Sequence, residues 1–352
     1  MKLLLINNLY PTEQNPQPAA YIKTQKDCLE AAGAQVDLQV LRADFTGFIS
    51  KYFSYLKFFA QLFFNLSYSK YNLIYLNHLP NYFFVLFFHF PFMKNVVIHW
   101  HGSEIYAPNL HNHWLNQISY LFTPKRFYHI APSEYFAKEV ARVMKITPQE
   151  VFISPSGGVD IEKFKPSDRN SKTNEVVIGF ASELSFMKGA DILLKLVVRK
   201  DELEKLCGRE IHFRAIAYGR NKKHFLEEFK KYSDRIEVLK PIPNEQMAGF
   251  FNSFDILLFP TRRKAESLGL VALEAMACGK PVLGPRAFAL PEYIKPGING
   301  EFYQSDTIDE VENVLVKMIQ SINGYKTREF VTEKYSNKTV IEGYKVFLKQ
   351  FE

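Results

Sequence analysis

Two carboxylates with the spacing of a ligand-binding pair, Glu266 and Glu274, stand eight positions apart within residues 259–285. The surrounding pattern predicts a strand, a loop, and a helix that begins at the N-cap Ser267 and runs to Cys278. The first turn of a helix presents unpaired N–H groups and a partial positive charge, so it can bind a phosphate. The predicted phosphate-binding residues are Ser267, Leu268, Gly269 and Leu270.

The spacing of the two glutamates suits a long polar ligand. If the helical rise extended over both, they would lie about 12 Å apart along the axis, roughly the reach from a sugar across a diphosphate to a ribose. Each carboxylate would then accept hydrogen bonds from hydroxyl groups at one end of the ligand. The alternative for Glu274 is a surface position on an amphipathic helix. Its neighbours Leu273, Ala275 and Met276 are apolar, however, and a carboxylate there would be poorly solvated.

The elements that position these residues follow from the alternation of short aliphatic runs with helical patterns, which begins with KLLLIN at 2–7. Such alternation predicts βαβ units and parallel sheets. It pauses at the polar loop 156–174 and restarts with EVVIGFA. We therefore expect an α/β protein with two doubly wound parallel-sheet domains. Helices are expected near residues 18–33, 51–66, 187–200, 221–231, 244–252 and 268–278.

The segment ESLGLVALE, followed by AMACGKPV, resembles the E-x7-E motif of the retaining glycosyltransferases of family 4, which have the GT-B fold. The resemblance extends over almost the whole chain. It is carried by WHGSE, APSEY, SGGVDIEKF, MKGADILL and GINGEFY, in this order and spacing. It implies transfer of a sugar from a nucleotide sugar to an acceptor, with retention at the anomeric carbon and no obligatory metal.

The resemblance also implies a division of labour between two Rossmann-like domains that face a cleft. Residues 1–158 are expected to bind the acceptor, and residues 159–335 the nucleotide sugar. Residues 336–352 are expected to form a helix that packs back on the N-terminal domain.

The resemblance implies roles for the residues of this chain that match the site residues of the family. Glu274 matches the ribose-binding glutamate, Glu266 the glutamate near the hydroxyls of the donor sugar, and Lys188 the lysine that neutralises the diphosphate. His101 matches a histidine beside the transferred sugar, and Gly219 a glycine under the nucleotide base. The alternative for His101 is a structural histidine at a strand end. Glu266, His101 and Lys188 are the expected catalytic group.

Two departures from the family pattern stand out. Glu183 occupies a position where the family usually has an arginine, and a carboxylate there would repel a diphosphate. Either the segment is shifted and Glu183 points elsewhere, or another cation replaces the arginine. The candidate cations are Arg220, Arg262 and Arg263. Pro18-Ala19-Ala20 stands where family members often carry glycines close to the donor phosphate, and alanine restricts the backbone there.

Composition limits the partners. The net charge of +7 is too small for a dedicated nucleic-acid binder, so no nucleic-acid partner is expected. The three cysteines are widely spaced, which indicates a reducing compartment and no structural zinc. The N-terminal segment is expected to be a buried strand rather than a signal peptide, and no membrane-spanning helix is predicted.

Residues 45–94 depart from the average composition because they are rich in aromatic side chains and contain no acidic residue. The helix expected at 51–66 has one narrow polar stripe on an otherwise apolar surface. A core helix that covers the sheet is one interpretation. The other is an aromatic and basic surface that contacts a membrane peripherally, and the two can coexist.

The resemblance therefore implies a retaining, metal-independent glycosyltransferase of the hexosyltransferase type. It would move a sugar from a UDP- or GDP-linked donor to a lipid-linked or polysaccharide acceptor in cell-surface polysaccharide synthesis. The expected location is the cytoplasm, with the inner face of the membrane left open. The alternatives are a nucleotide-sugar epimerase of the same fold and a degenerate protein that binds a sugar nucleotide without turnover.

Overall fold

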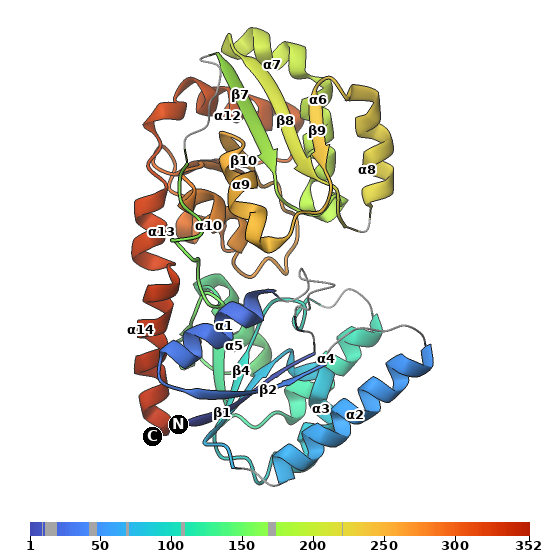
Figure 1. Cartoon of the computed structure of the whole chain (residues 1–352), viewed down its shortest axis with the longest axis vertical. Coiled ribbons are helices and arrows are strands. Elements are labelled where there is room, and N and C mark those ends of the chain that lie inside the picture. The colour runs from blue at the N-terminus through green and yellow to red at the C-terminus, as the bar shows by residue number, and fades with distance from the viewer. Residues whose placement is uncertain are drawn as a thin grey trace. The chain divides into compact units, whose positions relative to one another are not determined.

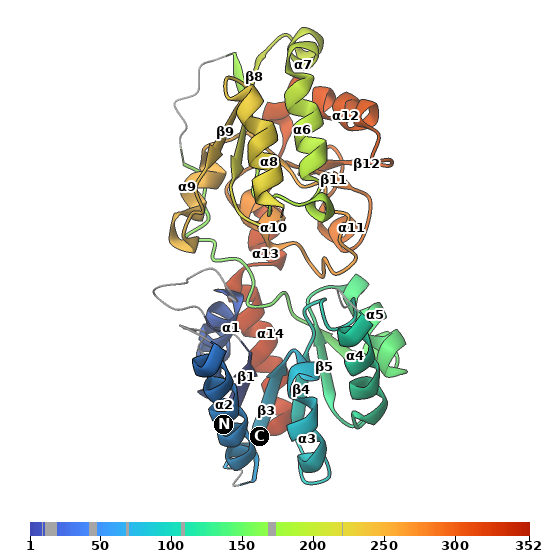
Figure 2. The ribbon, with the colours of Figure 1, turned by 90° about the vertical axis from the view of Figure 1, so that its right-hand side faces the viewer.

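In the computed structural model, the chain forms two compact units (Figures 1 and 2). The N-terminal unit comprises Met1–Gly158 with Asn337–Glu352, and the C-terminal unit comprises Val159–Ser336. The structure describes residues 1–8, 10, 20–41, 48–67, 70–106, 110–167, 174–219 and 221–352. Each unit contains one six-stranded parallel sheet, so the predicted α/β class with two doubly wound sheets is confirmed.

The sheet of the N-terminal unit has the strand order β2-β1-β3-β4-β5-β6. Its strands are β1 (Lys2–Asn7), β2 (Gln35–Val40), β3 (Leu73–Asn77), β4 (Val96–His99), β5 (Tyr128–Ala131) and β6 (Val151–Ile153). Its helices are α1 (Ala20–Ala31), α2 (Phe48–Ser67), α3 (Phe83–His89), α4 (Leu110–Phe122), α5 (Glu134–Met144) and α14 (Asn337–Leu348), with short 3₁₀ turns at Leu79–Tyr82, Pro148–Glu150 and Lys349–Phe351.

Strand β1 shows how its sequence fills both faces of this sheet. Leu3 and Leu5 pack in a core with α1 and α14, whereas Leu4 and Ile6 pack in a second core with α2, α3 and α5. Successive side chains of a strand point to opposite faces, so the continuous apolar run is what a strand buried on both sides requires.

The sheet of the C-terminal unit has the order β12-β11-β10-β7-β8-β9. Its strands are β7 (Glu175–Phe180), β8 (Glu210–Ile216), β9 (Ile236–Leu239), β10 (Ile256–Leu258), β11 (Val282–Pro285) and β12 (Gly300–Tyr303). Its helices are α6 (Ala190–Val198), α7 (Lys200–Cys207), α8 (Lys222–Phe229), α9 (Met247–Asn252), α10 (Leu270–Ala277), α11 (Leu290–Tyr293), α12 (Ile308–Gln320) and α13 (Arg328–Lys334), with short 3₁₀ turns at Phe186–Lys188, Lys230–Tyr232, Asn244–Gln246 and Ile322–Gly324.

Helices cover both faces of this second sheet. Residues of α6, α7, α8 and α12 pack in one core, and residues of α9, α10, α11 and α13 pack in the other. The expected helix at 187–200 is interrupted, because Gly189 adopts a left-handed conformation between a 3₁₀ turn and α6. The expected helix at 268–278 is shorter and begins at Leu270.

Strand order locates the ligand-binding edge of each sheet. In doubly wound sheets, ligands bind at the carboxyl ends of the strands where the strand order reverses. That point lies between β1 and β3 in the N-terminal unit and between β7 and β10 in the C-terminal unit.

Helix α14 belongs to the N-terminal unit although it is the last helix of the chain. It packs against α1, and Val340, Tyr344 and Phe347 join the core that contains Leu3 and Leu5. The Tyr344 hydroxyl lies 3.1 Å from the hydroxyl of Tyr75 on β3. Figure 1 shows the red helix α14 beside the strands of the N-terminal unit.

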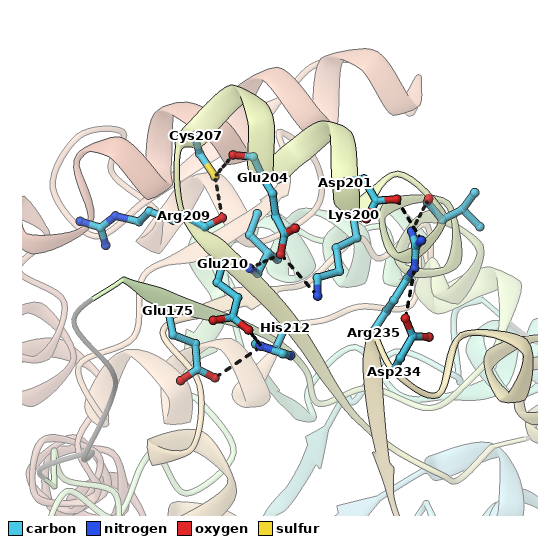
Figure 3. A network of polar contacts seen from close by, with 12 residues as sticks. Glu175, Lys200, Asp201, Glu204, Cys207, Arg209, Glu210, His212, Asp234 and Arg235 are labelled. Atoms are coloured by element: carbon cyan, nitrogen blue, oxygen red, sulfur yellow. Dashed lines mark hydrogen bonds and ion pairs between the residues drawn. The ribbon is translucent and has the colours of Figure 1, made fainter.

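A network of charged pairs lies at the amino ends of the strands of the C-terminal sheet, opposite its ligand-binding edge (Figure 3). His212 Nε2 lies 2.9 Å from Glu210 and 3.9 Å from Glu175, all near the amino ends of β7 and β8. Arg235 pairs with Asp201 at 3.0 Å and contacts the carbonyl of Val198. Because His212 and Arg235 pair with carboxylates away from the ligand-binding edge, we interpret this network as structural.

Candidate functional site

Two loops meet at the strand-order reversal of the C-terminal unit. Residues 181–189 follow β7, and residues 259–269 follow β10. Gly189 has φ of +75°, and a Cβ there would lie 2.3 Å from the carbonyl oxygen of Pro260. Only glycine permits this backbone approach, so Gly189 fixes the position of the first loop against the second.

Lys188 and Glu266 form an ion pair between these two loops. Each side chain is only 12% exposed. The Lys188 ammonium also lies 5.6 Å from the centre of the Phe259 ring, and the Thr261 hydroxyl donates to Glu266 at 3.2 Å. The structure therefore places two of the three predicted catalytic residues in direct contact, in a largely desolvated setting.

The predicted N-cap at Ser267 is wrong. Gly269 is the cap of α10, with φ of +87°, and Leu270 is the first helical residue. A Cβ at position 269 would lie 2.7 Å from the Tyr293 hydroxyl, so the close packing of the loop against α11 requires glycine there. Ser267 and the buried Leu268 lie in the preceding loop.

This correction also changes the geometry of the two glutamates. Glu266 precedes the helix, so the helical rise does not extend from Glu266 to Glu274 and the axial separation of about 12 Å does not apply.

Glu274 lies in the second turn of α10 and is partly buried. No hydrogen bond to its carboxylate occurs within the part of the chain that the structure describes. Burial raises the pKa of Glu274 to about 7, and the charge of Lys163 opposes this effect. A carboxylate held in this state gains by accepting hydrogen bonds from a ligand.

Tyr218 lies just beyond the carboxyl end of β8, and the charges of Glu274 and of two other carboxylates act on its hydroxyl. Its pKa is raised by burial and then by the charges of Glu183, Glu266 and Glu274. Gly219 follows, with φ of +104°, and a Cβ there would lie 2.6 Å from the Cβ of Glu183. Lys188, Gly219, Glu266 and Glu274 thus gather at one edge of the sheet, and Glu183 lies with them.

The structure bears on which of the three candidate cations could replace the family's arginine. Arg262 pairs with Asp191 at 2.6 Å and with Asp306 at 2.5 Å, so its charge is already engaged between α6 and the loop after β12. Arg263 is exposed. Arg220, Pro18 and Ala19 lie outside the described residues.

His101 lies in the N-terminal unit, two residues beyond β4. Its Nε2 lies 2.6 Å from Asn77 Oδ1, and the Asn77 amide donates to Gln25 Oε1 at 3.2 Å and to the carbonyl of Ile6 at 3.5 Å. Because a carbonyl only accepts, the Asn77 NH₂ faces Ile6 and its oxygen faces the histidine. His101 therefore carries its proton on Nε2, which leaves Nδ1 as an acceptor.

The chain of hydrogen bonds that begins at His101 continues into the core of the N-terminal unit. Gln25 Nε2 lies 2.5 Å from His99 Nδ1, and the rings of His99 and His101 stack with centroids 4.5 Å apart. Burial lowers the pKa of His101 well below its usual range, and the charges of His99 and His78 act in the same direction. Burial also lowers the pKa of His99, to about 3, so both rings are neutral at physiological pH.

His78 and Glu104 form a second layer beside His101. His78 has φ of 56°, and its Nδ1 lies 3.0 Å from Glu104 while its Nε2 lies 2.9 Å from the Tyr21 hydroxyl. Glu104 also accepts the backbone N–H of His101 at 3.2 Å. Burial acts to raise the pKa of Glu104, but the charge and hydrogen bond of His78 lower it to about 2.

Sequence reasoning missed the side chains that hold His101. Gln25, Asn77 and His78 belong to no recognisable short motif. Glu104 follows His101 by three residues within WHGSE, a spacing that could have indicated a carboxylate accepting the histidine's backbone N–H.

Comparison with known families bears on the C-terminal unit. Residues 161–334 match the family model described as "Glycosyl transferases group 1". This match spans almost the whole of the C-terminal unit. The matched residues include Lys188, Gly219, Glu266 and Glu274.

Curated relatives point to the same family. The chain is 25% identical over 195 residues to the D-inositol 3-phosphate glycosyltransferase of Mycobacterium marinum, covering 53% of this chain and 41% of the relative. It is 28% identical over 168 residues to the enzyme of the same name from Mycolicibacterium smegmatis, covering 44% and 38%. The chain thus spans about two fifths of the length of these curated relatives.

Solved structures match over nearly the whole chain. Sucrose-phosphate synthase from Thermosynechococcus elongatus has a TM-score of 0.77 at 16% identity, covering 99% of this chain and 98% of that chain. Anabaena HepE in complex with UDP and glucose has a TM-score of 0.72 at 17% identity, covering 99% and 100%. These likenesses confirm the expected GT-B fold class.

The described residues also bear on metal binding and on membrane crossing. They contain no group of three or more His, Cys, Asp or Glu side chains placed to hold a metal ion. Among the same residues, no helix is both long and apolar enough to cross a bilayer.

Proposed function

We propose that this group 1 glycosyl transferase domain and the N-terminal unit together transfer a hexose-type sugar from a UDP- or GDP-linked donor to an acceptor, with retention and without a metal. The observation that carries the proposal is the ion pair of Lys188 and Glu266 next to the glycine-capped start of α10. A cation and free N–H groups at one point favour a diphosphate, and a carboxylate beside them favours hydroxyl groups.

The donor would bind along the carboxyl edge of the C-terminal sheet. An ammonium has three N–H donors, so Lys188 can contact a diphosphate oxygen and keep its bond to Glu266. Glu266 would accept hydrogen bonds from the hydroxyls of the sugar. Glu274 would accept the ribose hydroxyls, which would relieve its desolvation, and Gly219 would lie under the base.

Catalysis would rest on charge stabilisation at the leaving group. The bond between the anomeric carbon and the phosphate oxygen breaks, and its electron pair goes to the diphosphate. The acceptor oxygen bonds to the anomeric carbon on the same face, and its proton goes to the leaving phosphate oxygen. Lys188 and the first turn of α10 would stabilise the negative charge that develops there. Neutral His101 would accept a hydrogen bond from the substrate through Nδ1.

The acceptor is proposed to be lipid-linked or a polysaccharide, in cell-surface polysaccharide synthesis. The expected partners are the nucleotide sugar and this acceptor, with no nucleic acid, and the proposed location is the cytoplasm or the inner face of the membrane. The basis is the aromatic and basic composition of residues 45–94.

The test is incubation of the purified chain with UDP- and GDP-sugars, after a thermal-shift screen for the nucleotide sugar that stabilises the protein. Nucleotide release that requires an acceptor, persists in EDTA and preserves the anomeric configuration supports the proposal. Interconversion of the sugar without an acceptor would instead identify an epimerase. Binding without turnover would identify a degenerate protein, a reading that Glu183 in the donor site favours.

A further inference from the structure

Exposed aromatic side chains gather on one part of the N-terminal unit. Among the described residues, eleven of the twelve exposed Phe, Tyr and Trp side chains lie on or beside α2, α3 and α4, and the twelfth is Phe186 of the other unit. We call this surface the α2–α4 face. Its aromatic members are Tyr52, Phe53, Tyr55, Phe63, Phe64, Phe84, Phe87, Phe88, Phe92, Trp114 and Phe122.

The face is continuous across the three helices. Phe63 of α2 contacts His89 of α3, with ring centroids 4.8 Å apart. Phe87 of α3 contacts Phe122 of α4 at 5.5 Å. Trp114 and Leu121 stand two helical turns apart on α4, so they share one side of that helix. An exposed apolar surface of this extent usually marks an interaction site.

On helix α2, the apolar side chains of this face are not packed against the sheet. Phe58, Leu62 and Leu66 are buried at a spacing of four residues and join the core. Phe53, Leu56 and Phe64 on the other sides of the same helix are more than half exposed. A helix that is apolar on its outer sides as well as on its buried side requires an apolar environment on those outer sides.

The segment that carries the face, residues 45–133, has surface charges of one sign. Glu104 is the single acidic residue between Asp44 and Glu134, and it is buried in the histidine cluster. Lys57, Lys94 and Lys125 are exposed on or beside the three helices. Aromatic rings with lysines around them suit the boundary between lipid headgroups and acyl chains.

A second copy of the chain fits this surface poorly. A two-fold interface places the same patch against itself, so lysines would face lysines with no carboxylate to pair with them. An anionic surface supplies the missing charge, and its apolar layer takes up the rings. We propose that the α2–α4 face binds the surface of a membrane that contains anionic lipid, with no helix crossing it. This binding does not depend on the transferase activity proposed above.

The chain contains its own reporter for this proposal. It has two tryptophans; Trp114 is 70% exposed on the face, and Trp100 is fully buried. Mixing the full chain with vesicles of phosphatidylcholine and phosphatidylglycerol at low salt should shift the tryptophan emission to shorter wavelength. The Trp114→Phe variant should float with the vesicles but show no shift.

Paired variants test whether vesicle binding depends on the α2–α4 face rather than on exposed apolar or basic residues elsewhere. In vesicle flotation, Phe88→Gln with Phe92→Gln should lower the bound fraction by about tenfold, because two rings no longer bury apolar area. The control Leu206→Gln with Val346→Gln, which changes exposed apolar residues elsewhere, should bind normally. Lys57→Glu with Lys94→Glu should lose binding at low salt, whereas Lys195→Glu with Lys317→Glu, which makes the same change of net charge in the other unit, should keep it.

Several outcomes would overturn the proposal. They are absence of vesicle binding by the unaltered chain, binding that the Phe88 and Phe92 substitutions leave unchanged, and binding that pure phosphatidylcholine supports equally well. Self-association in light scattering that these substitutions abolish, without vesicle binding, would assign the face to a second copy instead. Flotation needs no donor or acceptor, so its result is separate from that of the transferase assay.

Discussion

Lys188 and Glu266 form an ion pair in which their charges neutralise each other. We expect Lys188→Gln to lower kcat/KM for the donor by about 10²-fold, because a positioned group that stabilises developing charge is lost. Lys188→Arg should retain more activity, since the charge remains, although its geometry differs. Steady-state kinetics with the nucleotide sugar found by thermal shift measures both. Equal activity of Lys188→Gln and the unaltered chain would remove Lys188 from the site.

Glu274 should make stability depend on pH in a defined direction. Its pKa is about 7 in the folded protein and near 4.5 in the unfolded chain, so the folded state holds more protons between these values. Stability should therefore fall as pH rises through this window, by about 3 kcal/mol at most, and then level off. Urea unfolding of the unaltered chain and Glu274→Gln checks this, and the variant should lose that dependence. The exposed Glu245→Gln is the matched control.

Asn77 is expected to control the protonation of His101. In Asn77→Asp, a carboxylate would accept from His101 Nε2 in place of the amide oxygen. A neighbouring negative charge favours the imidazolium, so the pKa of His101, which burial lowers, should rise. Titration of the histidine ring signals by NMR measures the change. A His101 signal that titrates identically in both proteins would show that Asn77 does not act through this ring.

At the scale of elements, Gly269 holds the start of α10 in place. Gly269→Ala forces a left-handed conformation and also brings a Cβ to 2.7 Å from the Tyr293 hydroxyl. Gly297→Ala imposes similar backbone strain, at φ of +75°, with no atom within 4 Å. The first variant should therefore be less stable than the second by about 1 to 3 kcal/mol in urea unfolding, the usual penalty of overpacking. Equal stabilities would mean that the contact with Tyr293 relaxes freely.

Strands were the elements most open to prediction from sequence, and loop geometry the least. KLLLIN could be assigned because a strand buried on both faces is apolar throughout. Ser267 has the residue type of an N-cap, but Gly269 takes that place because packing against Tyr293 excludes a side chain. The sequence indicated Lys188 and Glu266 by family resemblance, whereas their contact depends on two loops that only the folded sheet brings together.

The histidine cluster illustrates the same limit. His101 was identified by its match to the family, but Gln25 and Asn77 come from α1 and β3, far apart in the chain. Nothing local in the sequence marks them, because their role depends on the register of β1, β3 and β4. Only the assembled sheet shows that they determine which ring nitrogen of His101 carries the proton.

At the scale of the whole molecule, the N-terminal unit depends on the end of the chain. Removal of residues 337–352 would strip Val340, Tyr344 and Phe347 from its core. We expect calorimetry of this truncated protein to show loss of the N-terminal unit's unfolding transition, while the C-terminal unit still unfolds cooperatively. Val346→Gln, an exposed change in the same helix, should leave both transitions in place. Two unaltered transitions after truncation would contradict the prediction.

The late position of α14 also bears on synthesis. As the polypeptide leaves the ribosome, the whole C-terminal unit, residues 159–336, emerges before residues 337–352. All residues of its sheet and cores are then available. Leu3 and Leu5 are fully covered only after residues 337–352, which are made later than residues 159–336, have packed against them. The half of the protein that is translated second can thus complete its fold first, while the earlier half remains exposed to chaperones and proteases.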